Sequence, residues 1–425
     1  MIGHRRPVVR TARPASGSRY ATHMFSSFRR LAVPFALPWL TAVAIAQSGS
    51  PPETDDGRRW LNPQSPASSP IDVASRATAL NRNDAAEELL RQIIRRAPRS
   101  PEAAEAHKLL SRIYLRTGRY KRATDNLDEW RRNFPNSADA HAELQDVDQF
   151  RGLPDQISGQ RRTAVLKHEG DLSIPLAVNG KECTFLMDTG AGVSVITQQA
   201  AERLGLEFRG AGGVIGDSSG KGFAAKTAVA KELILGNTRL KNVSFFVVPD
   251  QEPFTSAPVE HRGILGVPIQ FAVGTWQWSK SGTIRVGEKI APGGSQLNLV
   301  FYRNKTLVSA EIAGRSVFFT LDSGAIDTDL NSNFVESFGD VVASAQKTTR
   351  DITGVGGTST FEALILPELK VSVAGYPLTL RPAAVTVQRL GAIGGPCCVG
   401  NFGDDLLLQG EGFSLDLDNM SLRFK

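Results

Sequence analysis

Apolar positions along the chain change their spacing near residue 150. Between residues 71 and 150 they recur every three to four residues, as in the run 89–94, which predicts amphipathic helices. Breaks at 97–101, 117–118 and 133–136 divide this segment into helix pairs. Beyond residue 155 apolar and polar residues alternate and glycines are frequent, which predicts short strands joined by tight turns.

The β region contains two sets of predicted strands. The first set is 174–178, 183–187, 193–196, 228–235 and 243–248, with a helix near 197–204. The second set is 307–312, 317–321, 361–366, 369–373 and 385–387. Each set is followed by a hairpin of alternating pattern, at 276–286 and at 413–424. We expect the two hairpins to pair into one sheet, because pairing would cover otherwise exposed edges.

The first set places an acid, Asp188, at the end of an apolar strand and before a tight turn. Burial disfavours the charged form of a carboxyl unless hydrogen bonds or a second acid sharing its proton stabilise it, so the position predicts a partner. The partner is Asp322, which lies 322 − 188 = 134 residues later in a run of the same pattern.

The similarity extends to both sides of the two acids. Upstream, residues 176–180 align with 310–314, and downstream Ile264-Leu-Gly266 aligns with Cys398-Val-Gly400, both at the offset of 134. Three blocks in register indicate a duplicated unit. A pseudo-twofold axis between the copies would bring Asp188 and Asp322 together.

At these residues the chain resembles the aspartic proteases. The resemblance covers about residues 165–425 and rests on two acid turns, each followed by an apolar-apolar-Gly segment. The turns are Asp188-Thr189-Gly190-Ala191 and Asp322-Ser323-Gly324-Ala325. Ala after each Gly is similar to the retroviral type, whereas the pepsin type usually has Ser or Thr. The resemblance implies a mainly β fold with two homologous retropepsin-like β-barrel lobes in one chain.

The resemblance also implies a chemistry for the two acids. Like charges about 3 Å apart cannot both ionise, so the Asp188/Asp322 pair would hold one proton. The ionised member would take a proton from water, and the other would donate to the peptide carbonyl. The resemblance also implies supporting roles for the turn residues. Thr189 and Ser323 would hydrogen-bond across the axis, and Gly190 and Gly324 would leave room for substrate and backbone close to the acids. Ala191 and Ala325 have no hydroxyl that could donate to the acids.

Two Gly-rich stretches lie where the family places hairpins that close over substrate. Such tips can exclude water from the reacting groups, although an ordinary mobile turn has the same composition. The first stretch is Gly213, Val214, Ile215 and Gly216, and the second is Gly354, Val355, Gly356 and Gly357.

The helical segment resembles tetratricopeptide repeats, because Gly118, Tyr120, Ala123, Leu127 and Trp130 fit the second helix of one repeat. Such hairpins bind partner peptides or mediate assembly. A helical spacer packed on the protease is the alternative, since fewer than three repeats give little groove.

The N-terminus predicts export. From Met24, a possible true start, a basic stretch, an apolar run and Ala44-Ile-Ala46 form a secretory signal, so a periplasmic or secreted protein is expected. An N-terminal membrane anchor is the alternative. The predicted divisions are a leader at 1–46, a linker at 47–70, a helical region at 71–150, and protease lobes at 160–290 and 291–425.

Charge and cysteine content give no support to nucleic-acid-binding, disulfide-rich or metal-binding classes of protein. The net charge of +6 comes from seven arginines of the leader, and +6 − 7 = −1 remains for the rest, which gives no support to nucleic-acid binding. Three Cys make no disulfide framework, and no Cys or His spacing suggests a metal. No cofactor is predicted.

Two functions follow from the sequence. The first is an aspartic endopeptidase that hydrolyses polypeptide substrates with a water activated by the Asp188/Asp322 pair. The alternative is a catalytically inactive peptide-binding or scaffold protein of the same fold, with the helical region as its interaction surface.

Overall fold

The computed structural model describes residues 67–138, 140–141, 147–216, 222–290, 297–354, 357–388 and 397–425. The predicted leader and most of the predicted linker lie outside these residues. Within the described parts, no helix combines the length and apolar character needed to cross a membrane.

The predicted helix pairs are confirmed between residues 70 and 133. Ser69 and Ser100 accept hydrogen bonds from backbone N–H groups of the following first turns, and a Pro follows each cap. Gly118 adopts a φ of +70°, which favours glycine, at the turn between the last two helices. The helices are α2 Pro70–Ala79, α3 Asn83–Arg96, α4 Pro101–Arg116 and α5 Tyr120–Asn133, followed by a short 3-10 helix, η2 Asp148–Phe150.

Lobe 1 is built on an eight-stranded sheet in the order β1-β8-β5-β9-β4-β3-β7-β6. All five predicted strands of the first set are present, although β5 starts two residues later than predicted because Val193 and Ser194 belong to the turn. The strands are β1 Ile157–Ser158, β3 Ser173–Val178, β4 Lys181–Met187, β5 Val195–Thr197, β6 Glu207–Gly216, β7 Gly222–Leu235, β8 Thr238–Val248 and β9 Gly263–Leu265. The helices are α7 Gln198–Arg203, η3 Phe254–Ser256, η4 Val259–His261 and α8 Val267–Val273.

Lobe 2 is built on a ten-stranded sheet in the order β16-β17-β20-β15-β21-β14-β13-β18-β19, with β12 paired to β13. Its strands are β12 Leu299–Tyr302, β13 Lys305–Ile312, β14 Arg315–Leu321, β15 Asp329–Leu330, β16 Gln346–Gly354, β17 Gly357–Leu366, β18 Leu369–Val373, β19 Tyr376–Leu380, β20 Ala383–Thr386 and β21 Gly400–Phe402. Its helices are α9 Ser332–Ser337, α10 Gly339–Val342 and α11 Asp404–Leu407.

A five-stranded sheet joins the lobes, as the alternating hairpins predict. The pairing of β10 with β22 is antiparallel and places Trp276 opposite Leu415 and Trp278 opposite Phe413. These side chains are buried, so the junction belongs to the main hydrophobic core. The sheet order is β2 Ala164–Lys167, β11 Thr283–Val286, β10 Thr275–Ser279, β22 Gly412–Asp416 and β23 Ser421–Phe424.

One part of the predicted duplication is wrong. Lobe 1 brings β9 beside β4 with Met187 opposite Leu265, and lobe 2 brings β21 beside β14 with Leu321 opposite Phe402. The structural counterpart of Ile264-Leu-Gly266 is therefore Asn401-Phe402-Gly403, which lies 137 residues later, rather than Cys398-Val-Gly400. Lobe 2 has three extra residues before this strand, and a chance apolar-apolar-Gly match at the offset of 134 concealed them.

The backbone contacts of the two lobes support this alignment. The Gly266 N–H donates to the Ser194 hydroxyl (3.1 Å), and the Gly403 N–H donates to the Thr328 hydroxyl (2.9 Å). Ser194 and Thr328 are 134 residues apart, whereas the two glycines are 137 apart.

Cys397 and Cys398, the adjacent pair that precedes β21, form a disulfide with each other. This bond was not predicted, because three Cys, two of them adjacent, did not indicate a disulfide framework.

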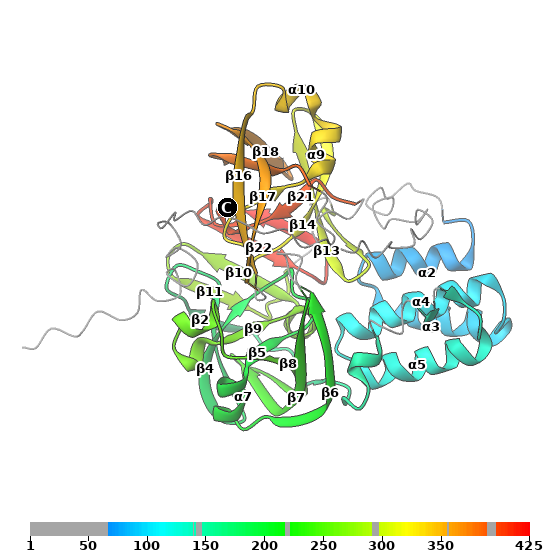
Figure 1. Ribbon diagram of the computed structural model, residues 1–425. Coiled ribbons are helices and arrows are strands. Elements are labelled where there is room, and N and C mark those ends of the chain that lie inside the picture. Colours follow the sequence, from blue (N-terminus) through cyan, green and yellow to red (C-terminus); the bar gives the residue numbers. More distant parts are fainter. Residues whose placement is uncertain are drawn as a thin grey trace, which may run out of the picture.

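The helical segment packs against both lobes (Figure 1). On lobe 1, the Phe150 ring meets the Phe246 ring edge-on at a centroid distance of 5.4 Å. On lobe 2, the Arg116 guanidinium lies 4.6 Å from the ring centre of Phe301. The Asn81 side chain also donates to the carbonyl of Leu417 (2.6 Å).

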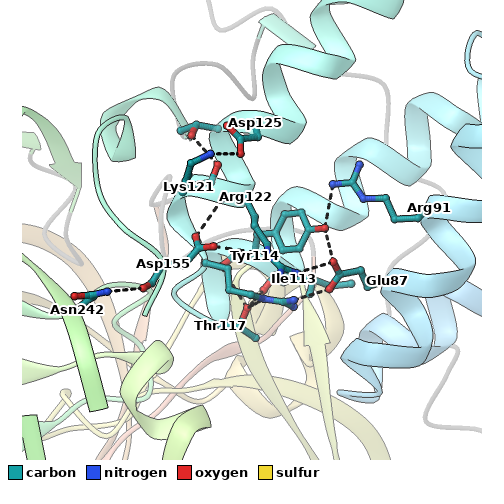
Figure 2. A network of polar contacts seen from close by, with 12 residues as sticks. Glu87, Arg91, Ile113, Tyr114, Thr117, Lys121, Arg122, Asp125, Asp155 and Asn242 are labelled. Atoms are coloured by element: carbon teal, nitrogen blue, oxygen red, sulfur yellow. Dashed lines mark hydrogen bonds and ion pairs between the residues drawn. The ribbon is translucent and has the colours of Figure 1, made fainter. Parts of the chain in front are cut away.

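A polar network ties the helices together and continues into lobe 1 (Figure 2). The Glu87 carboxylate accepts from the Tyr114 hydroxyl (2.7 Å) and pairs with Arg122 Nη1 (3.2 Å). The backbone N–H of Arg122 donates to Asp155 Oδ1 (3.2 Å), and the Asn242 side chain donates to the Asp155 carbonyl (3.5 Å). The helices and lobe 1 therefore share polar as well as apolar contacts.

Candidate active site

The two predicted acids lie together between the lobes. Asp188 follows β4 and Asp322 follows β14, and a hydrogen bond joins their side chains. The backbone N–H of Asp188 donates to the Leu265 carbonyl (3.2 Å), and that of Asp322 donates to the Phe402 carbonyl (3.0 Å). The neighbouring strands β9 and β21 therefore fix the two acid turns in equivalent positions.

The residues after the acids hold the turns to each other, as the resemblance implies. The Thr189 N–H donates to the Ser323 hydroxyl oxygen, and the Ser323 N–H donates to the Thr189 hydroxyl oxygen, each at 3.0 Å. The Ser323 hydroxyl in turn donates to the Met187 carbonyl (2.8 Å). Thr189 and Ser323 are buried, so these bonds link the lobes away from water.

Each glycine of the two turns faces the acid of the other lobe. A Cβ atom on Gly190 would lie 2.5 Å from Asp322 Oδ1, and a Cβ atom on Gly324 would overlap the Asp188 carboxyl. A residue with a side chain at either position would push the acids apart. These glycines therefore permit the close approach of the two acids.

Burial shifts both carboxyls toward the neutral form. Desolvation, followed by the neighbouring Asp322, raises the pKa of Asp188 above its ordinary value. Desolvation also raises the pKa of Asp322, although hydrogen bonds and the positive charge of Lys305 oppose the rise. Two adjacent acids with raised pKa values hold one proton between them over a wide pH range.

Backbone donors supply the hydrogen bonds that Ala191 and Ala325 cannot give through side chains. The N–H groups of Gly190 (2.8 Å) and Ala191 (3.0 Å) donate to Asp188 Oδ1. In lobe 2 the Gly324 N–H donates to Asp322 Oδ1 at 3.3 Å.

Asn401 is a site residue that the sequence analysis missed. Its side-chain Nδ2 donates to Asp322 Oδ2 at 2.9 Å, and Asn401 itself is buried. Its counterpart in lobe 1 is Ile264, which has no hydrogen-bond donor in its side chain. The available signal was the second Gly-ended triplet, Asn401-Phe402-Gly403, but the exact offset of Cys398-Val-Gly400 favoured the wrong alignment.

Two further charged residues near the pair were also missed. Lys305 at the start of β13 lies close to Asp322, and its lobe 1 counterpart is the acid Asp171. Asp404 at the start of α11 lies near both Asp188 and Asp322, where burial and then these acids raise its pKa well above the ordinary value. Asp404 Oδ1 is buried and has no hydrogen-bond partner in the described structure. The raised pKa favours a neutral Asp404, which lowers the cost of burying it.

The predicted flap stretches lie at hairpin ends. Gly213, Val214, Ile215 and Gly216 end β6, and Val214 is 68% exposed. In lobe 2, Gly354 ends β16 and pairs with Gly357, which begins β17, whereas Val355 and Gly356 lie outside the described residues. The role of these hairpins in substrate binding stays a prediction.

Among the described residues, no group of three or more His, Cys, Asp or Glu side chains could hold a metal ion.

The fold and the paired carboxyls define a bilobal, mainly β protein similar to the aspartic proteases, with a helical-repeat segment before the lobes. A family model described as aspartyl protease matches residues 174–269, which include Asp188. A tetratricopeptide repeat model matches residues 74–138. The chain thus resembles aspartyl proteases in its lobes and tetratricopeptide repeats in its helices, and the matches support a protease-type function.

A solved structure to which this chain is similar is a retropepsin-like aspartic protease from Rickettsia conorii. It shares 16% identity and covers 31% of this chain and 93% of its own, with a TM-score of 0.21. The comparison with curated proteins gives no match.

Proposed function

We propose that this protein is an aspartic endopeptidase that cleaves polypeptides with a water activated by Asp188 and Asp322. The observation that carries the proposal is the placement of these two acids, from equivalent turns of two lobes, in hydrogen-bond contact. The reciprocal bonds between Thr189 and Ser323 support it, because they fix the acids relative to each other.

The proposed reaction uses the single proton of the pair. The ionised acid removes a proton from water as the water oxygen attacks the peptide carbonyl carbon. The neutral acid donates its proton to the carbonyl oxygen, which gives a neutral tetrahedral intermediate. Collapse of this intermediate breaks the C–N bond: the acid that gained the water proton donates it to the leaving amine nitrogen, and the other acid, now ionised, removes a proton from a hydroxyl of the intermediate. The pair thereby regains its single proton.

The helical segment has a supporting part in this proposal. Its contacts with Phe246 in lobe 1 and with Phe301 and Leu417 in lobe 2 favour a spacer that packs on the lobes. The tetratricopeptide match leaves the outward surface as a site for a protein partner.

Incubation with a peptide library tests the proposed function. The full chain is expected to cut internal peptide bonds, and pepstatin, which occupies aspartic protease sites, is expected to stop the cleavage. Mass spectrometry of the products identifies the cut bonds. A protein that binds the peptides and leaves them intact across pH 3–7 would support the inactive scaffold instead.

The pH dependence of cleavage follows from the raised pKa values. Because burial raises the pKa of both acids and no hydroxyl lies at positions 191 and 325, we expect an optimum in the mildly acidic range, roughly pH 4–6. Ala191→Ser adds a donor to the charged form of Asp188, which lowers its pKa. Ala191→Ser, and likewise Ala325→Ser, should therefore move the activity optimum to lower pH. An optimum near pH 2 in the wild type would contradict this account.

A further inference from the structure

The surroundings of the two acids differ between the lobes. Asp188 accepts hydrogen bonds from two backbone N–H groups, those of Gly190 and Ala191. Asp322 accepts from the Gly324 backbone and also from the Asn401 side chain, which binds its second oxygen, Oδ2. Both oxygens of Asp322 are therefore hydrogen-bonded.

The side-chain donor is specific to lobe 2. The residue that occupies the place of Asn401 in lobe 1 is Ile264, which cannot donate. An amide that donates to a carboxylate stabilises the charged form more than the neutral form, because the bond is charge-assisted. The pseudo-twofold relation thus allows the surroundings of Asp322 to be compared with those of Asp188 in the same molecule.

The charged neighbours also stabilise the negative charge of Asp322 more than that of Asp188. The positive charge of Lys305 in β13 acts on Asp322, whereas the equivalent position in lobe 1 holds Asp171. The other ionisable groups near Asp322 are Asp188 itself and Asp404 of α11. Asp404 favours its neutral form, so Lys305 is the main charge that distinguishes Asp322 from Asp188.

We propose that Asp322 holds the negative charge of the pair and Asp188 holds the proton, and that Asn401 and Lys305 are the positioning residues that set this order. The inference rests on the proposed function in one respect: it assigns Asp322 as the base that takes the proton from water and Asp188 as the acid that donates to the carbonyl. The distribution of charge itself does not depend on catalysis.

Titration of each acid alone tests the proposal. Full-length Asp188→Asn leaves Asp322, and Asp322→Asn leaves Asp188. With aspartate labelled at the ¹³C carboxyl carbon, subtraction of the spectrum of the double variant isolates the remaining carboxyl. We expect the midpoint of Asp322 to lie at least about one pH unit below that of Asp188, as one charge-assisted hydrogen bond predicts. Equal midpoints, or a lower midpoint for Asp188, would overturn the proposal.

Asn401→Ile, which installs the lobe 1 residue, identifies the source of the difference. In the Asp188→Asn background it should raise the midpoint of Asp322 by about one pH unit. In the Asp322→Asn background it should leave the midpoint of Asp188 in place, which is the matched control. Equal shifts in both backgrounds would assign Asn401 a general structural role and contradict the proposal.

The two hypotheses can fail separately. Absence of peptide cleavage by the wild type would reject the endopeptidase, while the titrations would still measure the order of the two acids. Cleavage by the wild type together with equal midpoints would reject only the assignment of base and acid.

Discussion

Replacement of either Asp188 or Asp322 with Asn is expected to lower kcat for peptide cleavage by at least about 10³-fold. An amide is close in size to a carboxyl but can neither take a proton from water nor deliver one to the carbonyl. The remaining acid then lacks its partner in proton transfer. The measurement is kcat and KM on the best peptide from the library, at the pH optimum of the wild type.

Two comparisons make this result specific. Asp340→Asn removes an exposed carboxyl in α10 that pairs with Arg315, so it should leave kcat within about twofold. The melting temperatures of Asp188→Asn and Asp322→Asn should stay at or above that of the wild type, because neutral amides relieve the burial of two acids. Full cleavage by both variants would show that another group performs the reaction and would refute the proposed mechanism.

Much of the β region was predictable because the burial pattern is regular. The strand β4 was expected as 183–187 and is observed as Lys181–Met187, since its apolar residues alternate toward one core. The pairing of β10 with β22 followed from two hairpins of alternating pattern, because pairing covers their otherwise exposed edges. The contact of Asp188 with Asp322 followed from the duplication.

The parts that were missed depend on spacing in three dimensions. Asn401, which donates to Asp322, was missed because lobe 2 has three extra residues before β21, and a comparison at constant offset cannot show such a shift. Lys305 and Asp404 come from the start of β13 and the start of α11, which are far from Asp322 in sequence. No local pattern connects them to the acid turn, so only the fold identifies them as neighbours.

The attachment of the helices to the lobes leads to the second large expected effect. Phe150 is 4% exposed, stacks on Tyr120 at a centroid distance of 4.6 Å and meets Phe246 edge-on at 5.4 Å. Phe150→Ala removes this ring from both contacts and leaves a cavity, at a cost of about 3–5 kcal/mol in the free energy of unfolding. The thermal transition that includes the helical segment should fall by roughly 5–15 °C in scanning calorimetry.

Phe208→Ala is the matched control, because Phe208 is the same residue type in lobe 1 but is 41% exposed. Its transition should move by no more than about 2 °C, since an exposed ring loses little contact on truncation. Limited proteolysis gives a second measurement: Phe150→Ala should expose the chain near residues 151–156 to cleavage earlier than Phe208→Ala does. If both variants melt at the same temperature as the wild type, the helices are an independent module rather than a segment packed on the lobes. A partner-binding role for the helices would then be favoured over a spacer role.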